Sequence, residues 1–229
     1  VNDDSKKQVQ LVMQQFPMLY GIMFSKITVS DTKVDLTEEV IEYIVAAYRI
    51  KIENSALLGD YYKSFYLTKL DNMKFDIGAP SLSTFPEIPT LSPESYEKNV
   101  QISKNYHIER QDKKFDWNPP PFETACFYSY NENRVKIYAG ALLRSVEVDN
   151  VNIAHPFASI GRTISHEMMH AFDNVGMNFD GNGKHLNWFK KLFTGVLFNQ
   201  NDLDSAYDQI VKQYNDYTIR DSLHVDGVK

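Results

Sequence analysis

Apolar residues recur at helical spacing over two stretches in the N-terminal third of the chain. Between residues 36 and 66 they return every three to four positions, which predicts a helix, and Thr37 followed by two glutamates indicates its start. Residues 5–24 carry a weaker signal of the same kind and are also predicted to be helical. The apolar positions that carry the stronger signal are Leu36, Val40, Ile44, Ala47 and Tyr48.

A different pattern, in which apolar and polar residues alternate, follows residue 123. It predicts two strands within 124–142, joined by a turn at Asn131 to Asn133, with Val135, Ile137 and Ala139 on one face of the second strand. A short extended stretch is also expected within 69–80, between a helix end and a Gly-x-Pro sequence.

The rest of the chain is divided by proline-rich loops and further helices. Loops are expected at 80–93, 115–123 and 145–158, and helices at 94–113 and 159–174.

Composition limits the possible functions without changing this picture. At 43% hydrophobic and 24% charged residues, the 229-residue chain has the average composition of a soluble globular protein. A net charge of -6 argues against a nucleic-acid partner. No apolar run reaches the roughly 18–20 residues of a membrane helix, and the first residues do not form a targeting signal. The single cysteine, Cys126, excludes an internal disulfide and is expected to be a buried thiol.

The helix at 159–174 contains a pattern typical of a zinc site. His166 and His170 are four residues apart, so a helix places both imidazoles on one face, where they can bind one tetrahedral ion. Glu167 projects beside such an ion, where a general base must lie to take a proton from water. Asp173 shares the histidine face and can accept a hydrogen bond from the free ring nitrogen of a ligating histidine.

The third ligand of such a site is not evident from the sequence. A longer zinc pattern, with glycine at 173 and histidine at 176, is excluded because these positions are Asp173 and Gly176. Glu167 is the last glutamate of the chain. The candidates that remain downstream are His185, His224, Asp202, Asp204 and Asp208, each of which is also an ordinary surface residue.

Three separated segments together resemble one enzyme family. The run "SHEMMHAFDNVGMNFDGNGKHLNWF" resembles the zinc-binding segment of the neprilysin and endothelin-converting-enzyme family of metallopeptidases, whose pattern is H-E-x-x-H-x-F-D, then G-x-N-F-D-x-x-G and a tryptophan. "KLDNMKFDIGAP" at 69–80 resembles the family's connection between its helical and catalytic lobes. "FYSYNENRVKIYAGAL" at 127–142 resembles its active-site edge strand and the residues that follow.

This resemblance implies a role for each matching residue. His166 and His170 are implied as zinc ligands, Glu167 as the general base and Asp173 as a supporting carboxylate. The implied activity is cleavage of peptides, in which the base activates zinc-bound water. The edge strand at Ala125 and Cys126 is implied to pair with the backbone of the substrate.

Three departures from the family pattern accompany the match. Ala125 stands where the family has a substrate-binding asparagine, and Met177 where it has an arginine. The family's third ligand is the glutamate of a G-E-N-x-A-D segment, and "DSLHVDGVK" resembles the residues that lead into it. The chain is therefore expected to be a piece of such an enzyme without its N-terminal part and its C-terminal tail, and to have little or no peptidase activity in isolation.

We expect a mainly helical α+β fold, in which the end of a helical lobe and the inter-lobe linker (1–85) precede an incomplete thermolysin-like zinc lobe (86–229). The expected function is that of a neprilysin-like zinc endopeptidase. Two alternatives stay open: a catalytically inactive homologue that binds peptides or proteins, and an unrelated helical protein with a chance motif. By the resemblance, the parent protein is extracellular or a membrane-anchored ectodomain. The oligomeric state is left open.

Overall fold

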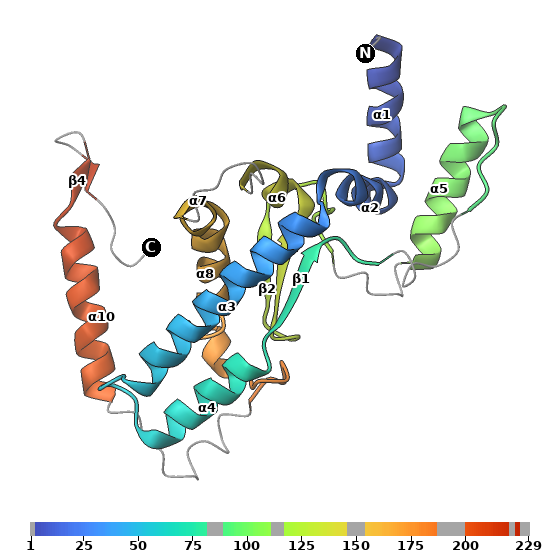
Figure 1. Cartoon of the computed structure of the whole chain (residues 1–229). Coiled ribbons are helices and arrows are strands. Elements are labelled where there is room, and N and C mark those ends of the chain that lie inside the picture. The colour runs from blue at the N-terminus through green and yellow to red at the C-terminus, as the bar shows by residue number, and fades with distance from the viewer. Residues whose placement is uncertain are drawn as a thin grey trace.

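The computed structural model describes residues 3–81, 89–110, 117–145, 154–186, 200–219 and 223–224. Four helices form the N-terminal part, and Figure 1 shows the long third helix running diagonally across the sheet. They are α1 (Asp3–Gln15), α2 (Pro17–Thr28), α3 (Asp31–Glu53) and α4 (Asp60–Asp71). This part of the chain is helical as predicted, but with different boundaries.

Both predicted N-terminal helices are divided in two. The 5–24 helix breaks at Phe16, whose backbone leaves the helical region, so that Pro17 can occupy the first position of a new helix, where its missing N–H is not needed. The 36–66 helix ends at Glu53, and the next one, α4, begins at Asp60 after Gly59 as its N-cap. The prediction that the helix starts at Thr37 was wrong. The helix is capped seven residues earlier by Ser30, whose hydroxyl accepts a hydrogen bond from the Lys33 N–H.

A three-stranded sheet lies behind these helices, in the order β1-β3-β2. β1 (Lys74–Gly78) pairs in parallel with β3 (Arg134–Tyr138), and β2 (Cys126–Ser129) pairs antiparallel with β3 and forms an edge. The predicted extended stretch and both predicted strands are thus confirmed. Asn133, at the turn between β2 and β3, has a positive φ of 50°, which asparagine tolerates better than most residues.

The central strand β3 is buried on both faces, which its alternating pattern did not predict. Val135 and Ile137 lie on the face that packs against the other apolar residues, but Lys136 is also buried, at 4% exposed. Its ammonium forms an ion pair with Glu132 at 3.0 Å, which compensates the burial of the charge. Ala139 is not in the strand, because helix α6 (Ala139–Ser145) begins there.

The structure describes several further elements. They are α5 (Tyr96–Arg110), α7 (Ala154–Pro156), the π-helical turn η2 (Phe157–Gly161), α8 (Arg162–Met169), the 3₁₀ turn η3 (Gly176–Asn178), α10 (Gln200–Asn215) and the short pair β4 (Thr218–Ile219) and β5 (Leu223–His224). The loop predicted at 145–158 is therefore helical from residue 154, and its residues 146–153 lie outside the described part.

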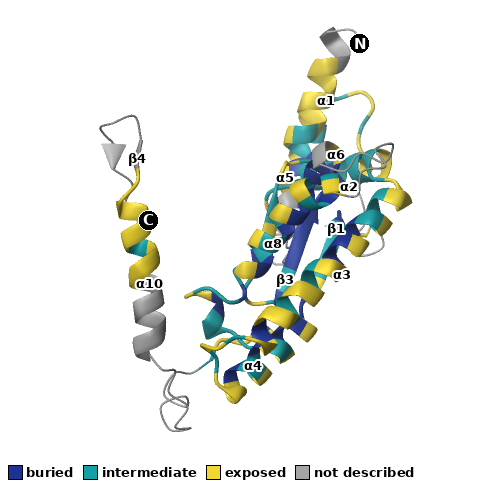
Figure 2. Ribbon diagram, turned by 60° about the vertical axis from the view of Figure 1, so that its left-hand side comes forward, coloured by how far each residue is buried: buried dark blue, intermediate teal, exposed yellow. Residues whose placement is uncertain are grey.

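Helix α8 packs against the sheet and completes the core. Figure 2 shows the buried surface concentrated where β3, α8 and the inner sides of α3 and α4 meet. Ile164 and Met168 of α8 are fully buried there, whereas Met169 is 53% exposed. The apolar cluster includes residues of α3, α4, β2, β3 and α8. The mainly helical α+β fold is confirmed, and helices from before residue 85 share this cluster with the strands that follow it.

Candidate metal centre

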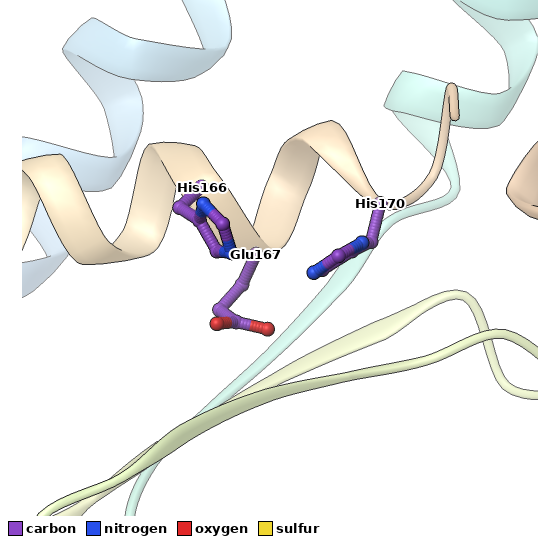
Figure 3. A group of neighbouring side chains, drawn as sticks. All are labelled: His166, Glu167 and His170. Carbon is purple, nitrogen blue, oxygen red and sulfur yellow. The ribbon is translucent and has the colours of Figure 1, made fainter. Parts of the chain in front are cut away.

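Helix α8 carries the three side chains of the predicted metal motif. His166, Glu167 and His170 each offer a ligand atom, and these atoms lie within 4.8 Å of one another. The two imidazole rings are 5.0 Å apart, centre to centre, and nearly perpendicular. Figure 3 shows the two rings and the Glu167 carboxylate on the side of the helix that faces the strands. The spacing therefore brings together the groups that it was predicted to bring together.

The helical segment begins before the predicted 159, at Ala154 of α7, and ends before the predicted 174; its α-helical part α8 spans Arg162–Met169. Helix α8 follows a π-helical turn and ends at Met169, with His170 as its C-terminal cap. There the backbone tightens: the His170 N–H bonds to the Glu167 carbonyl, three residues back, at 3.2 Å. Asp173 consequently lies in the turn beyond the helix rather than on its face.

From this turn Asp173 still reaches His170. Its Oδ2 lies 2.8 Å from Nδ1 of His170, and its Oδ1 accepts backbone N–H groups from Val175 at 2.9 Å and Gly176 at 2.7 Å. Partial burial alone would raise the pKa of Asp173, but the hydrogen bonds from Gly176, His170 and Val175 outweigh it and lower the pKa. The carboxylate is therefore held ionised next to the ring, and it engages Nδ1 in a way that leaves Nε2 free for a metal.

Glu167 has a different environment from Asp173. Burial raises its pKa, while the two neighbouring histidines and a backbone hydrogen bond from Tyr128 partly oppose this effect. Because Tyr128 belongs to β2, the Glu167 carboxylate lies between the helix and the edge strand. A carboxylate with a raised pKa in this place is suited to accept a proton from water.

Of the two residues singled out in the sequence near the edge strand, Cys126 lies close to this carboxylate. The thiol of Cys126 is partly buried, and burial together with the nearby Glu167 raises its pKa to about 12, so it is a neutral packing group. The backbone of Ala125 is already engaged: its carbonyl accepts from the Tyr138 N–H at 3.2 Å and its N–H donates to the Glu123 carbonyl at 3.0 Å.

Comparison with known proteins gives the same assignment as the motif. The family model "Peptidase family M13" matches residues 125–229. The match covers a little under half of the chain. The match confirms the resemblance to the neprilysin and endothelin-converting-enzyme family, because the matched segment contains both the edge strand and the zinc helix.

The M13 likeness extends beyond the matched segment. The endothelin-converting enzyme homolog of Locusta migratoria is 24% identical over 226 residues, covering 90% of this chain and 29% of the relative. The neutral endopeptidase of Lactobacillus helveticus is 25% identical over 194 residues, 80% of this chain and 30% of that protein. The chain thus spans about 30% of the length of these relatives.

Solved M13-like structures share the fold. Zinc metalloprotease ZMP1 of Mycobacterium tuberculosis in its open state superposes with a TM-score of 0.78 at 21% identity, covering 100% of this chain and 36% of that one. PepO of Lactobacillus rhamnosis superposes with a TM-score of 0.71 at 21% identity, covering 93% of this chain and 34% of that one.

In the part of the chain that the structure describes, no helix has the length and apolar character needed to span a membrane.

Two of the downstream candidates for a third ligand, His185 and Asp208, are described by the structure, and neither joins the cluster. His185 is exposed, and its ring lies against Phe179 at 5.1 Å. Asp208 is exposed on α10, and the side chains of Asp202, Asp204 and His224 lie outside the described residues. Among the described residues, the cluster that can hold a metal consists of His166, Glu167 and His170.

Sequence reasoning missed three residues that support the candidate site. Buried Lys69 of α4 donates to the carbonyls of Gly176 at 2.6 Å and Phe179 at 2.8 Å, and so ties down the turn that follows Asp173. Asn133 accepts from the Tyr128 hydroxyl at 2.7 Å and donates to the Lys69 carbonyl at 2.8 Å.

The third missed residue is Tyr130, whose hydroxyl lies 3.3 Å from Oδ2 of Asp173. For Asn133 alone, its position in the predicted turn was a signal in the sequence. Lys69 and Tyr130 contact residues more than 40 positions away, so no local pattern marks them.

Proposed function

We propose that this chain carries the zinc-binding part of a neprilysin-like endopeptidase that cleaves peptides. In this proposal His166 and His170 bind zinc, Glu167 is the general base, and Asp173 orients His170. The observation that carries it is the convergence of the two histidines and the glutamate next to an edge strand, in a segment that matches peptidase family M13.

The residues present fit a zinc ion. Imidazole nitrogen is a preferred zinc ligand, and catalytic zinc sites often combine two histidines with a carboxylate. The short contact between Asp173 and Nδ1 of His170 is the arrangement that fixes a ligating histidine with Nε2 outward. Zinc bound there would supply a Lewis acid that polarises the scissile carbonyl and lowers the pKa of water.

Glu167 would take the proton in this reaction. Its carboxylate is held by the Tyr128 N–H, so it faces the space between α8 and β2 in which a substrate carbonyl would lie. Burial raises its pKa above the usual value, so its carboxylate is a stronger base than that of an exposed glutamate. The base is therefore held by the same strand that would bind the substrate.

Strand β2 supports a peptide as the substrate. It is the edge of the sheet, so an extended peptide can add to it through backbone hydrogen bonds. Along a strand, the backbone groups of successive residues point alternately to the two sides, so residues two apart point the same way. The Tyr128 N–H points away from β3, toward Glu167, and the backbone groups of Cys126 therefore also point away from β3. An open pocket of about 430 Å³ beside this strand, lined by Phe127, Ser129 and Lys136 among others, offers space for a substrate side chain.

Zinc content tests the metal site directly. The purified chain, loaded with zinc and desalted, is expected to retain close to one zinc per chain by elemental analysis, and His166→Ala to retain much less. If the unchanged chain did not retain stoichiometric zinc, the proposed site would be wrong.

Peptidase activity is then measured with a quenched fluorescent peptide on the longest natural form of the protein. Glu167→Gln is the variant expected to bind zinc without cleaving the peptide.

A catalytically inactive homologue that binds peptides is the second candidate. It is favoured by Ala125, which cannot make the hydrogen bond implied for the family's asparagine, and by Met177, which lacks the charge of the family's arginine. Peptide binding without cleavage, equally strong in Glu167→Gln, would support this candidate over the peptidase.

We further infer that residues 1–85 belong to the helical lobe of the parent enzyme and residues 86–229 to its catalytic lobe. The parent enzyme is inferred to act outside the cell or as an anchored ectodomain. The order of the family segments along the chain supports the division, and the resemblance to the family supports the location. Limited proteolysis of the parent protein tests the division, since cleavage is expected within the proline-rich stretch at 80–93.

A further inference from the structure

Tyr130 lies one residue beyond the edge strand and points its hydroxyl at the metal centre. The oxygen is 3.3 Å from Oδ2 of Asp173 and 3.5 Å from Nδ1 of His170. We propose that Tyr130 is a positioning residue, which fixes the Asp173 carboxylate and through it holds His170 with Nδ1 protonated and Nε2 free to bind metal. This inference rests on the zinc site proposed above and adds to it a residue that the family pattern does not contain.

The hydrogen bonds of Asp173 show why the tyrosine matters. A carboxylate has about four acceptor positions. Oδ1 accepts two backbone N–H groups, from Val175 and Gly176, and Oδ2 accepts from the His170 ring and from the Tyr130 hydroxyl. All four positions are therefore filled. Among the residues that the structure describes, Tyr130 supplies the side-chain hydrogen bond to Asp173 that comes from outside the segment 170–176.

The distances also assign the proton. The ring nitrogen of His170 is much closer to Asp173 (2.8 Å) than to Tyr130 (3.5 Å), so Nδ1–H donates to the carboxylate and the Tyr130 hydroxyl donates to the same oxygen. Nδ1 cannot both carry this proton and bind a metal. The arrangement therefore selects the Nε2-coordinating form of the ring.

Packing on several sides holds the tyrosine ring in place. It lies 5.3 Å from the ring of Tyr128 in an edge-on contact and 5.7 Å from that of Phe179, and its edge-on contact with His170 spans 6.2 Å. Phe179 is itself tied to buried Lys69 through its carbonyl. The hydroxyl thus reaches Asp173 from a ring that its neighbours already hold, so little conformational entropy opposes the hydrogen bond.

The test is a double-mutant cycle on zinc affinity, measured by competition with a chromophoric chelator. Asp173→Asn is expected to weaken zinc binding by about 10–100-fold, as for other residues that orient metal ligands, and Tyr130→Phe by less, about 3–10-fold. Because Tyr130 acts through Asp173, adding Tyr130→Phe to Asp173→Asn is expected to change the affinity by less than about twofold. The absorption spectrum of the cobalt-substituted protein should shift in Tyr130→Phe, which a general loss of stability would not cause.

Tyr48→Phe is the matched control. The Tyr48 hydroxyl also bonds to helix α8, through the Ser165 carbonyl at 2.8 Å, but it does not touch the histidine or the aspartate. Its loss is expected to leave zinc affinity and the cobalt spectrum unchanged. Unchanged zinc affinity in Tyr130→Phe, or full additivity of the two changes, would overturn the proposal while leaving the zinc site intact.

The metal-free chain gives a readout that does not depend on zinc. Nitrogen-15 NMR of the histidine side chains at pH 8 is expected to show His170 mainly in the Nδ1–H form, and more of the Nε2–H form in Tyr130→Phe. If the ratio of the Nδ1–H form to the Nε2–H form were the same in the unchanged chain and in Tyr130→Phe, the role of Tyr130 would be contradicted. This holds even if the unchanged chain bound no zinc.

Discussion

Helix α8 and the edge strand β2 contribute to the same site in different ways. On α8 and its C-terminal cap, the short spacing along the helix brings ligand atoms of His166, Glu167 and His170 within 4.8 Å of one another. The strand side contributes a backbone N–H from Tyr128 to Glu167 and a hydroxyl from Tyr130 to Asp173, each across about 40 residues of sequence. The comparison shows that local periodicity gathers the candidate ligands, while distant contacts set their orientation.

The helix side should give the largest effect when it is broken. Zinc sites with four ligands bind with about 10–16 kcal/mol, so losing one ligand is expected to cost about 3–4 kcal/mol, or several hundredfold in affinity. His170→Ala should show this loss in the chelator competition. His185→Ala, an exposed histidine outside the cluster, is the control and should bind zinc as the unchanged chain does. Similar affinities for the two variants would remove His170 from the site.

Removing the Lys69 contact, which holds the turn after Asp173, should have the next largest effect. Lys69→Met keeps most of the side-chain volume but leaves the carbonyls of Gly176 and Phe179 without their charged donor. The expected loss is about 2–3 kcal/mol in the free energy of unfolding, measured by urea denaturation. Lys51→Met, at an exposed position on α3, should change it by less than about 0.5 kcal/mol.

On the strand side, a hydrogen-bonding group can be added. Ala125→Asn restores the side chain that the family resemblance implies for substrate binding, and one hydrogen bond contributes about 0.5–1.5 kcal/mol. We expect KM for a peptide to fall by about two- to tenfold in the parent enzyme, with kcat little changed. Ala125→Leu adds bulk without a donor or acceptor and should not lower KM. A KM unaffected by asparagine would mean that substrates do not pair with this end of β2.

The smallest expected effect is on stability and comes from Glu167, the carboxylate that lies between α8 and β2. Burial raises the pKa of Glu167, so its ionised form is less favourable in the folded than in the unfolded chain. Glu167→Gln should therefore stabilise the metal-free protein at pH 7. The gain should disappear below about pH 4, where the carboxyl is protonated in both states. Urea unfolding across this pH range, with chelator present, measures it, and a gain that persisted at low pH would point to packing rather than charge.

The sequence predicted the metal motif because its ligands lie within five residues on one helix, where spacing alone determines geometry. The strands were equally accessible, since "CFYS" and "RVKIY" flank a turn with asparagine at a positive-φ position. Helix boundaries were less accurate. Ser30 and Thr37 are both acceptable caps in sequence, and only the observed Lys33 N–H to Ser30 contact distinguishes them.

The sequence by itself therefore determined the class of fold, the zinc motif and the family resemblance, because each depends on short-range periodicity or on residue identity at fixed spacing. Tertiary structure alone decided that Lys69 ties the turn after Asp173, that β3 is buried on both faces, and that Tyr130 reaches Asp173. The physical reason is that these contacts join segments from 43 to more than 100 residues apart in sequence. Hydrogen bonds and burial at such separations depend on how elements pack, and local sequence does not encode that directly.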